Sequence, residues 1–166
     1  MIQKHYVTTP TGIALKFQGI IDLPELYRQM KLWLEDKGYA KGETIEKSYV
    51  EKMKPGGKQI EIRWECGKNV SDYFKYKVNV LFILLGVSEV EVTQDGVKRK
   101  LYNGNFQVYI IGYVEEGSKE WESLGPFVRL YHNLIARRRI EDHKHELYNK
   151  IYSFQDFIRK FLEVRT

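Results

Sequence analysis

The residues that could bind a charged partner or carry out chemistry lie mainly in the C-terminal quarter of the chain. Arg137, Arg138 and Arg139 are consecutive, and Lys144 follows within two helical turns. On a helix, three consecutive side chains spread over about 200°, so these arginines cannot all face one row of phosphates. Together with Lys144 they form a candidate surface for an acidic protein partner, and a solvated helix face is the alternative interpretation.

Two histidines in the same stretch raise the question of a metal site. His143 and His145 are two positions apart, which places their side chains about 160° away from each other on a helix. Glu141 and His145 have the i, i+4 spacing of a zinc pair, but no further carboxylate or cysteine is in register with them. We therefore interpret both as surface histidines and predict no metal and no cofactor.

Catalytic motifs are absent from the sequence. It contains no G-x-S-x-G elbow, no glycine-rich phosphate loop and no H-E-x-x-H pair. The single Cys66 lies in an alternating strand pattern with no histidine beside it, which is typical of a small buried residue. Residues 55–58, Pro-Gly-Gly-Lys, fit a hairpin turn better than a phosphate loop. We therefore predict a protein that is not an enzyme.

The formal net charge of +5 is unevenly distributed along the chain. Residues 126–166 contain nine Lys and Arg against five Asp and Glu, and the first 125 residues contain eighteen against seventeen. The basic excess therefore belongs to the C-terminal segment, where phosphate contacts or an acidic partner would use it. Lys and Glu together make up 34 of the 166 residues, a composition that leans towards the surface chemistry of thermophiles.

The overall composition is that of a folded protein. Hydrophobic residues make up 43% of the chain, and 166 residues suffice for one domain with its own core. The first ten residues lack the apolar region of a signal peptide. No window approaches the run of about 18 apolar residues that a transmembrane helix requires. We expect a cytoplasmic protein without a membrane span.

The longest helical pattern covers residues 126–164. Pro126 suits the first turn of a helix, and neither glycine nor proline follows it. About 38 residues would give a helix of roughly 57 Å, longer than the diameter of about 40 Å expected for a domain of this size. Between residues 137 and 146 nine of ten positions are polar. We therefore expect either a bend there or a helix end that projects from the domain.

The segment before this helix contains one shorter helical pattern. Asp22 and Glu25 form a capping box for a helix over residues 23–37, because the Asp22 side chain can accept from free N–H groups of the first turn. Gly38 is suited to the position just after the last helical residue. The apolar residues in between have helical spacing, as expected for a helix that packs on a sheet.

The rest of the N-terminal segment predicts strands. Residues 60–66 and 73–85 alternate between apolar and polar side chains, as strands with one buried face do. Asp95-Gly96 and Asn103-Gly104 are both signals for two-residue hairpin turns, and they predict an antiparallel meander. The remaining predicted strands cover residues 3–7, 13–18, 44–53, 87–94, 97–102 and 105–115.

We predict a single α+β domain over residues 1–166. A curved antiparallel sheet and the short helix lie in residues 1–117, and the long C-terminal helix over 126–164 packs on the sheet. This order of elements resembles the START-like helix-grip superfamily, also called SRPBCC, in which a sheet and a long C-terminal helix enclose a cavity. The resemblance covers most of the chain and implies a fold that is used by lipid and hormone carriers, cyclases and oxygenase subunits.

Apolar and aromatic side chains of the predicted strands and helix would meet in such a cavity. There they could line a site for a small apolar or amphipathic ligand, with tyrosine hydroxyls to orient it, and a filled core is the alternative. We expect a non-enzymatic ligand-binding domain. The alternatives are a protein-interaction or homo-oligomeric assembly protein that uses the long basic helix, and weak nucleic-acid binding through that helix. The candidate cavity residues are Trp64, Phe74, Tyr76, Phe82, Phe106, Tyr109, Leu134, Leu147, Ile151 and Phe154.

Overall fold

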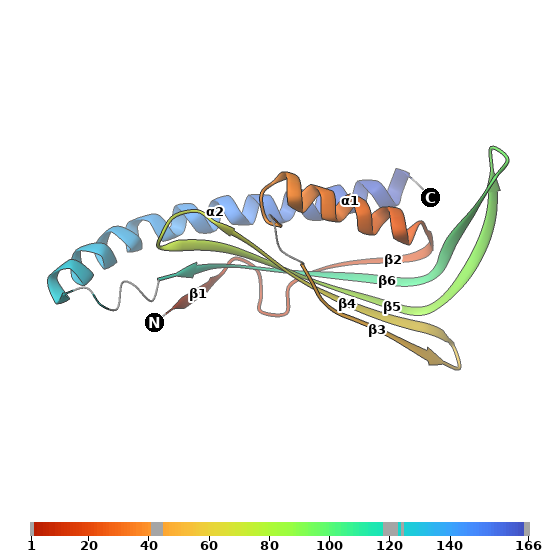
Figure 1. Ribbon diagram of the computed structural model, residues 1–166, viewed down its shortest axis with the longest axis horizontal. Coiled ribbons are helices and arrows are strands. Elements are labelled where there is room, and N and C mark those ends of the chain that lie inside the picture. The colour runs from red at the N-terminus through yellow and green to blue at the C-terminus, as the bar shows by residue number, and fades with distance from the viewer. Residues whose placement is uncertain (1, 41–44, 118–122, 124, 165–166) are drawn as a thin grey trace.

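The computed structural model describes residues 2–40, 45–117, 123 and 125–164. These residues form a six-stranded antiparallel sheet with two helices over one of its faces (Figure 1). The predicted α+β fold, with a short N-terminal and a long C-terminal helix, is therefore confirmed. The elements are β1 Gln3–Tyr6, β2 Ile13–Ile21, α1 Leu23–Asp36, β3 Glu46–Lys54, β4 Gly57–Asn69, β5 Phe74–Gln94, β6 Val97–Glu116 and α2 Pro126–Val164.

The sheet is assembled around β6. One edge of β6 pairs with β5, and the order continues through β4 to β3. The other edge pairs with β2 between residues 102 and 110 and with β1 between residues 113 and 116. Because Phe74 pairs with Glu116, β5 begins where β6 ends. The β4–β5 connection and the start of α2 therefore lie at the same end of the sheet (Figure 1).

The long β5–β6 ribbon corrects the prediction of a turn at Asn103-Gly104. The turn of this ribbon is made by Asp95 and Gly96, which have φ of 53° and 77°, as this type of hairpin requires. Asn103 instead lies inside β6 and pairs on both sides with neighbouring strands. A Cβ on Gly104 would lie 3.1 Å from the carbonyl oxygen of Leu85. A glycine that permits close approach of two strands thus gave the same sequence signal as a turn.

The part of the β5–β6 ribbon that carries its turn bends away from the rest of the sheet (Figure 1). The register of β5 against β6 shifts between Leu85 and Ser88, and Gly86 has a positive φ of 61°. A Cβ on Gly57 of β4 would lie 2.9 Å from the carbonyl carbon of Gly86. Glycines therefore allow β4 and β5 to touch where they diverge, and the end of the ribbon projects beyond the sheet.

Both ends of α1 are formed as the sequence predicted. The Asp22 side chain accepts a hydrogen bond from the Glu25 N–H at 3.2 Å. At the other end Gly38 has φ of 86°, and the Tyr39 N–H donates to the Leu34 carbonyl at 2.8 Å, which closes the last turn. These caps fix the helix so that one face is buried on the sheet. That face consists of Leu26, Met30 and Leu34.

The core lies between the sheet and the two helices. Trp33 of α1 stacks on Phe154 of α2 with 4.8 Å between ring centroids. α2 lies close to the backbone of β6 at Gly112, where a Cβ would lie 1.8 Å from Ile151 Cδ1. The alternating strand residues predicted to face inwards are all buried. They are Ile60, Ile62, Trp64 and Cys66 of β4 and Phe74, Tyr76, Val78, Val80, Phe82 and Leu84 of β5.

α2 is one continuous helix of 39 residues, which at about 1.5 Å per residue is about 58 Å long. Its buried stripe continues through the polar segment, because Ala136, Ile140 and Leu147 are all buried. The first turns of α2 extend past the end of the strands (Figure 1). The projecting helix end is therefore present. Among the described residues, no helix combines enough length with enough apolar character to cross a membrane.

Candidate functional site

Eight of the ten predicted cavity residues lie together in the core. They pack on one another directly, as the edge contact between the rings of Trp64 and Phe82, with 4.7 Å between centroids, illustrates. Phe74 is the one among them that also lines a pocket described below. The eight buried residues are Trp64, Phe74, Tyr76, Phe82, Phe106, Leu147, Ile151 and Phe154.

Tyr109 and Leu134 lie elsewhere, contrary to their assignment to an interior cavity. Phe106 and Tyr109 are three positions apart on β6, so strand alternation places them on opposite faces of the sheet. Tyr109 is half-buried on the outer face, and its hydroxyl donates to Gln107 Oε1 at 2.9 Å. Leu134 is 55% exposed, because it lies on the face of α2 that is directed away from the sheet.

A pocket opens at the end of the sheet where α2 begins. It has a volume of about 350 Å³ and lies between the β4–β5 connection and one flank of α2. This volume falls in the range of about 300–1,000 Å³ that is typical of small-molecule sites. The lining residues are Val70, Ser71, Asp72, Tyr73 and Phe74 from the connection and the start of β5, and His132, Ile135, Ala136, Arg139 and His143 from α2.

The pocket combines an apolar lining with two side chains of opposite charge, the exposed Asp72 and Arg139. Phe74 and Ala136 are core side chains, and Ile135 is half-buried beside them. Arg139 is exposed at the edge of the pocket, and its guanidinium forms no ion pair or hydrogen bond with the described residues. A planar guanidinium offers paired donors that match a carboxylate or phosphate group. The pocket can therefore accept a molecule with an apolar body and an anionic group.

His143 is held in the wall of the pocket by Tyr76. The Tyr76 hydroxyl donates to Glu146 Oε2 at 2.9 Å and lies 2.7 Å from His143 Nδ1. A carboxylate can only accept, so the single hydroxyl proton is directed to Glu146 and His143 Nδ1–H donates to the hydroxyl oxygen. The ring of Phe74 packs on His143 with 4.4 Å between centroids. These contacts fix the imidazole through Nδ1 and its ring, and they do not involve Nε2.

Burial affects the acidity of the tyrosine in this cluster. Desolvation, followed by the hydrogen bond to Glu146, raises the pKa of Tyr76 well above its ordinary value. Tyr39 lies near the same carboxylate, and burial raises its pKa to about 12. Both phenols therefore remain protonated near neutral pH, and they act as hydrogen-bond donors and packing groups.

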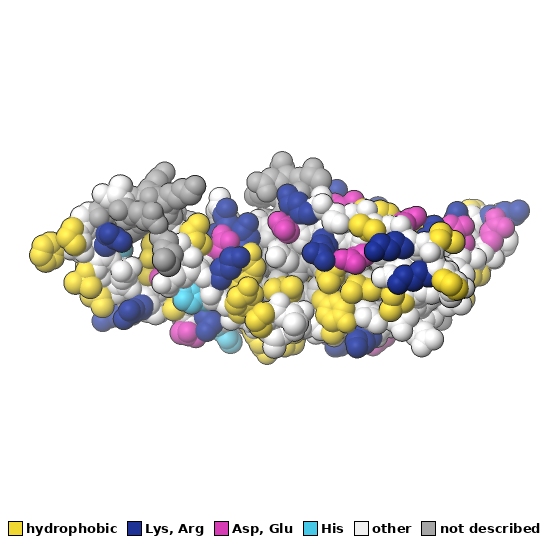
Figure 2. Space-filling model, turned by 90° about the horizontal axis from the view of Figure 1, so that it is seen from below, with side chains coloured by type: hydrophobic (Ala, Val, Ile, Leu, Met, Phe, Trp, Pro, Cys, Tyr) yellow, Lys and Arg dark blue, Asp and Glu magenta, His cyan; other side chains and the backbone are white. Residues whose placement is uncertain are grey.

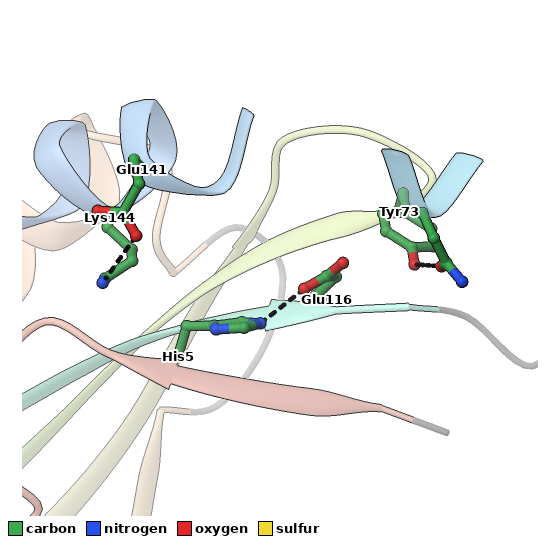
Figure 3. A network of polar contacts seen from close by, with 6 residues as sticks. His5, Tyr73, Glu116, Glu141 and Lys144 are labelled. Carbon is green, nitrogen blue, oxygen red and sulfur yellow. Dashed lines mark hydrogen bonds and ion pairs between the residues drawn. The ribbon is translucent and has the colours of Figure 1, made fainter. Parts of the chain in front are cut away.

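A second polar cluster ties the strands together at the same end (Figure 3). His5 Nε2 on β1 lies 2.6 Å from Glu116 Oε2 on β6. The Tyr73 hydroxyl donates to Asn133 Oδ1 of α2 at 3.3 Å, and burial, followed by the charge of Glu116, raises the pKa of Tyr73. One contact joins β1 to β6, and the other joins the pocket residue Tyr73, just before β5, to α2.

The candidate partner surface does not form one continuous patch. Arg137, Arg138 and Arg139 are all exposed, and the last of them lines the pocket. Lys144 is half-buried, and its Nζ lies 3.2 Å from Glu141 Oε1. Because successive residues of a helix turn by about 100°, the other two arginines point in different directions from Arg139.

The thiol of Cys66 is not activated, and the described residues contain no cluster of metal ligands. Cys66 is buried, and burial raises the pKa of its thiol to about 12. The thiol therefore stays protonated near neutral pH, and a protonated thiol is a poor nucleophile. Within the described ranges, no group of three or more His, Cys, Asp or Glu side chains is placed to hold a metal ion.

Sequence reasoning named Phe74 for an interior cavity and Arg139 for a partner surface, and it did not connect the two. It interpreted His143 as a surface histidine, but His143 is half-buried in the wall of the pocket. A signal was present in the order of the strands, because β5 starts beside the end of β6 and α2 follows β6. The start of α2 must then lie near the β4–β5 connection. The sequence does not reveal how far α2 extends past the end of the sheet. This length decides which helix residues reach residues 70–74.

Comparison of the chain with protein-family models, with curated proteins and with solved structures gave no significant match. The antiparallel sheet under a long C-terminal helix is compatible with helix-grip topology. A fold alone does not select a function, so the function has to be argued from the side chains of the pocket.

Proposed function

We propose that this protein is a non-enzymatic binding domain that holds a small amphipathic anion between residues 70–74 and α2. The observation that carries the proposal is the pocket of about 350 Å³, in which apolar side chains lie next to the guanidinium of Arg139. The site differs from the interior cavity considered from the sequence, because the interior side chains pack against one another.

The lining specifies the chemistry of the ligand. An aliphatic or aromatic body would contact Phe74, Ile135 and Ala136, and the burial of apolar surface would supply most of the affinity. A carboxylate or phosphate would pair with Arg139, since charge-assisted hydrogen bonds to a guanidinium are short and strong. The fixed imidazole of His143 offers a second polar contact at the same end of the ligand.

The fold supports a binding role at this position. In the helix-grip superfamily, which the chain resembles in its order of elements, ligand carriers hold their ligands between the sheet and the long helix. The pocket lies between the β4–β5 connection and α2, beside the open end of these two layers. The resemblance therefore favours a carrier or sensor of small molecules over a purely structural protein.

The buried thiol of Cys66 and the phenol that holds His143 favour binding over catalysis. Burial raises the pKa of the Cys66 thiol to about 12, so it is not a nucleophile near neutral pH. The raised pKa of Tyr76 likewise makes this phenol a weak acid. These groups can orient a ligand by hydrogen bonds, but their ordinary protonation states at neutral pH do not provide an activated nucleophile or acid.

The proposal is tested by calorimetric titration of the protein with decanoate, an amphipathic anion. We expect saturable binding by the wild-type chain and a loss of affinity of about tenfold or more in Arg139→Gln, because a charge-assisted hydrogen bond contributes about 1.5–3 kcal/mol. Arg138→Gln is the matched control, since this neighbouring arginine is exposed and does not line the pocket. Its affinity should change by no more than about twofold.

Decanol provides a second control, because it has the same tail without the charge. Its affinity should be the same in the wild-type chain and in Arg139→Gln. Equal loss of decanoate affinity in Arg138→Gln and Arg139→Gln would show that only the general positive charge of the helix matters. That result, or no saturable binding of either compound, would contradict the proposed pocket.

A further inference from the structure

The projecting turns of α2 carry a contiguous stripe of exposed apolar side chains. Phe127 is 86% exposed and Tyr131 is 63% exposed. Figure 2 shows hydrophobic side chains gathered at this end of the molecule. The largest contiguous apolar patch on the surface of a protein is often a contact site. The outer stripe, as we call it, consists of Phe127, Val128, Leu130, Tyr131 and Leu134.

The outer stripe is not a continuation of the stripe that α2 buries on the sheet. At about 100° per residue, the mean direction of the outer stripe lies roughly 170° from that of Ala136, Ile140 and Leu147. These three residues are buried, and the five of the outer stripe are exposed. The start of α2 therefore has a second apolar face directed away from its own sheet, which no described element covers.

The outer stripe is large enough for an interface between two copies. A complete Phe or Tyr side chain contributes about 150–250 Å², so five largely exposed apolar residues present roughly 500 Å². Two copies that cover each other's stripe would remove about 1,000 Å² from water in total. A specific interface needs about this area at least.

The spacing of the stripe is self-complementary. Two copies of α2 can run antiparallel with the two-fold axis between Leu130 and Tyr131. Leu130 of one copy then lies opposite Tyr131 of the other, and the reverse. Phe127 then lies opposite Leu134 in the same way. We propose that the outer stripe is the interface of a symmetric homodimer in which the first turns of two α2 helices pair antiparallel. Such an isologous contact closes on itself and stops at two copies.

The positions of the arginines select the antiparallel arrangement. In this pairing the residue opposite Arg138 is Ser123 of the second copy, which precedes the first residue of α2. Residues 137–139 of one copy therefore lie beyond the helix of the other, far from the same three arginines of the second copy. A parallel pair would place the arginines of both copies side by side, which is unfavourable. The antiparallel pair also places the two sheets at opposite ends of the dimer.

Sedimentation equilibrium of the full chain tests the dimer. We expect a dimer at about 50 µM and a weakening of the dimer by about thirtyfold or more in Leu130→Glu, which puts a charge at the centre of the contact. Tyr148→Glu is the matched control, since Tyr148 is an exposed aromatic on α2 outside the outer stripe. It should remain dimeric. Circular dichroism should show unchanged helix content in both variants, because both positions are exposed.

Disulfide formation tests the direction of the helices without a disruptive charge. A mixture of Phe127→Cys and Leu134→Cys chains should form the mixed disulfide, because these positions face each other in the antiparallel pair. Phe127→Cys alone should not form a disulfide, since residue 127 of one chain and residue 127 of the other are separated by about 10 Å along the helix axis. Buried Cys66 serves as the internal unreactive thiol.

Three results would overturn the proposal. The first is a chain that stays monomeric at all concentrations up to about 50 µM. Association that weak would not fit an interface of this area. The second is a dimer that Leu130→Glu leaves intact, or that forms the Phe127→Cys disulfide in preference to the mixed one. The third is a monomer that sediments with vesicles of phosphatidylcholine and phosphatidylglycerol, which would assign the outer stripe to a lipid surface.

Discussion

Arg139 and His143 line the same pocket but are held in different ways. The His143 ring is fixed between the Tyr76 hydroxyl and the ring of Phe74. Arg139 is exposed and has no such contact within the described residues, so its side chain loses freedom only when an anion binds. A ligand would therefore meet one preorganised polar group and one adaptable charged group. This combination gives orientation through His143 and charge selection through Arg139.

Removal of the Tyr76 hydroxyl should lower the stability of the fold. In Tyr76→Phe the hydrogen bonds to His143 and Glu146 are lost while the ring stays in the core. We expect the free energy of unfolding to fall by about 1–2 kcal/mol, because both partners keep some access to water. Urea unfolding measures this change. The exposed Tyr6 is the control, and Tyr6→Phe should leave the urea midpoint nearly unchanged. Equal effects of the two substitutions would refute a role for the cluster.

At the scale of elements, the contact between α2 and β6 sets the position of the pocket. α2 is positioned on the sheet where the side chain of Ile151 lies directly on the backbone of Gly112. From this contact the helix runs over the end of the sheet, where Ala136 and Arg139 reach residues 70–74. A shift of the helix away from Gly112 would therefore also change the width of the pocket.

Gly112→Ala should be strongly destabilising for this reason. The new Cβ would lie 1.8 Å from Ile151 Cδ1 and 3.0 Å from Val7 Cγ2, so the helix or the side chain must move. We expect a loss of about 2–3 kcal/mol in the free energy of unfolding. Gly56→Ala is the control, because no atom lies within 4 Å of a Cβ there.

A double variant identifies the cause of this loss. Ile151→Val removes the methyl group that the new Cβ would meet, so it should restore part of the stability of Gly112→Ala. If the effects of the two substitutions simply add, steric overlap with Ile151 is not the reason for the destabilisation.

The elements were largely predictable because local pattern determines them, and the exceptions have identifiable physical causes. Alternation identified the buried faces of β4 and β5, and the caps identified α1. The Asn103-Gly104 pair was misread, because the need for close strand approach at Gly104 depends on the neighbouring strand. Tyr109 was assigned to the wrong face of the sheet. It is three positions from Phe106, and residues an odd number of positions apart on a strand point to opposite faces. The pocket required knowledge of how α2 lies on the sheet, which no local pattern contains.

At the scale of the whole molecule, buried phenols and the buried thiol link stability to alkaline pH. Burial raises the pKa of Tyr27, Tyr39 and Cys66 to about 12 each, from ordinary values of 10.0 for tyrosine and 9.0 for cysteine. The unfolded chain therefore releases these protons at lower pH than the folded one. Their contribution to stability is fully present below pH 9 and is lost as the pH rises towards about 12.

Guanidinium unfolding at a series of pH values measures this dependence. The midpoint should be insensitive to these groups up to about pH 9 and should then fall steadily towards pH 12, together with the appearance of tyrosinate absorbance. A midpoint that stays constant between pH 9 and 12 would show that these groups are not buried in the folded protein.

The projecting end of α2, the pocket and the outer stripe all lie at the end of the molecule where α2 begins. Binding at the proposed pocket would use the flank of α2 that faces residues 70–74, and the proposed dimer would use the side directed away from the sheet. The two sites therefore need not exclude each other. Loss of the dimer in Leu130→Glu should leave decanoate affinity unchanged within about twofold, because Leu130 does not line the pocket.

The most direct test of the proposed function is an amide NMR spectrum of the labelled protein titrated with decanoate. The account predicts saturable shift changes concentrated in residues 70–74 and 132–143, with little change in the core strands. Changes concentrated in the amides of β4 and β5 around Trp64 and Phe82 would instead place the ligand in the interior. Such a result, or no saturable change anywhere, would contradict the pocket at the open end of the sheet.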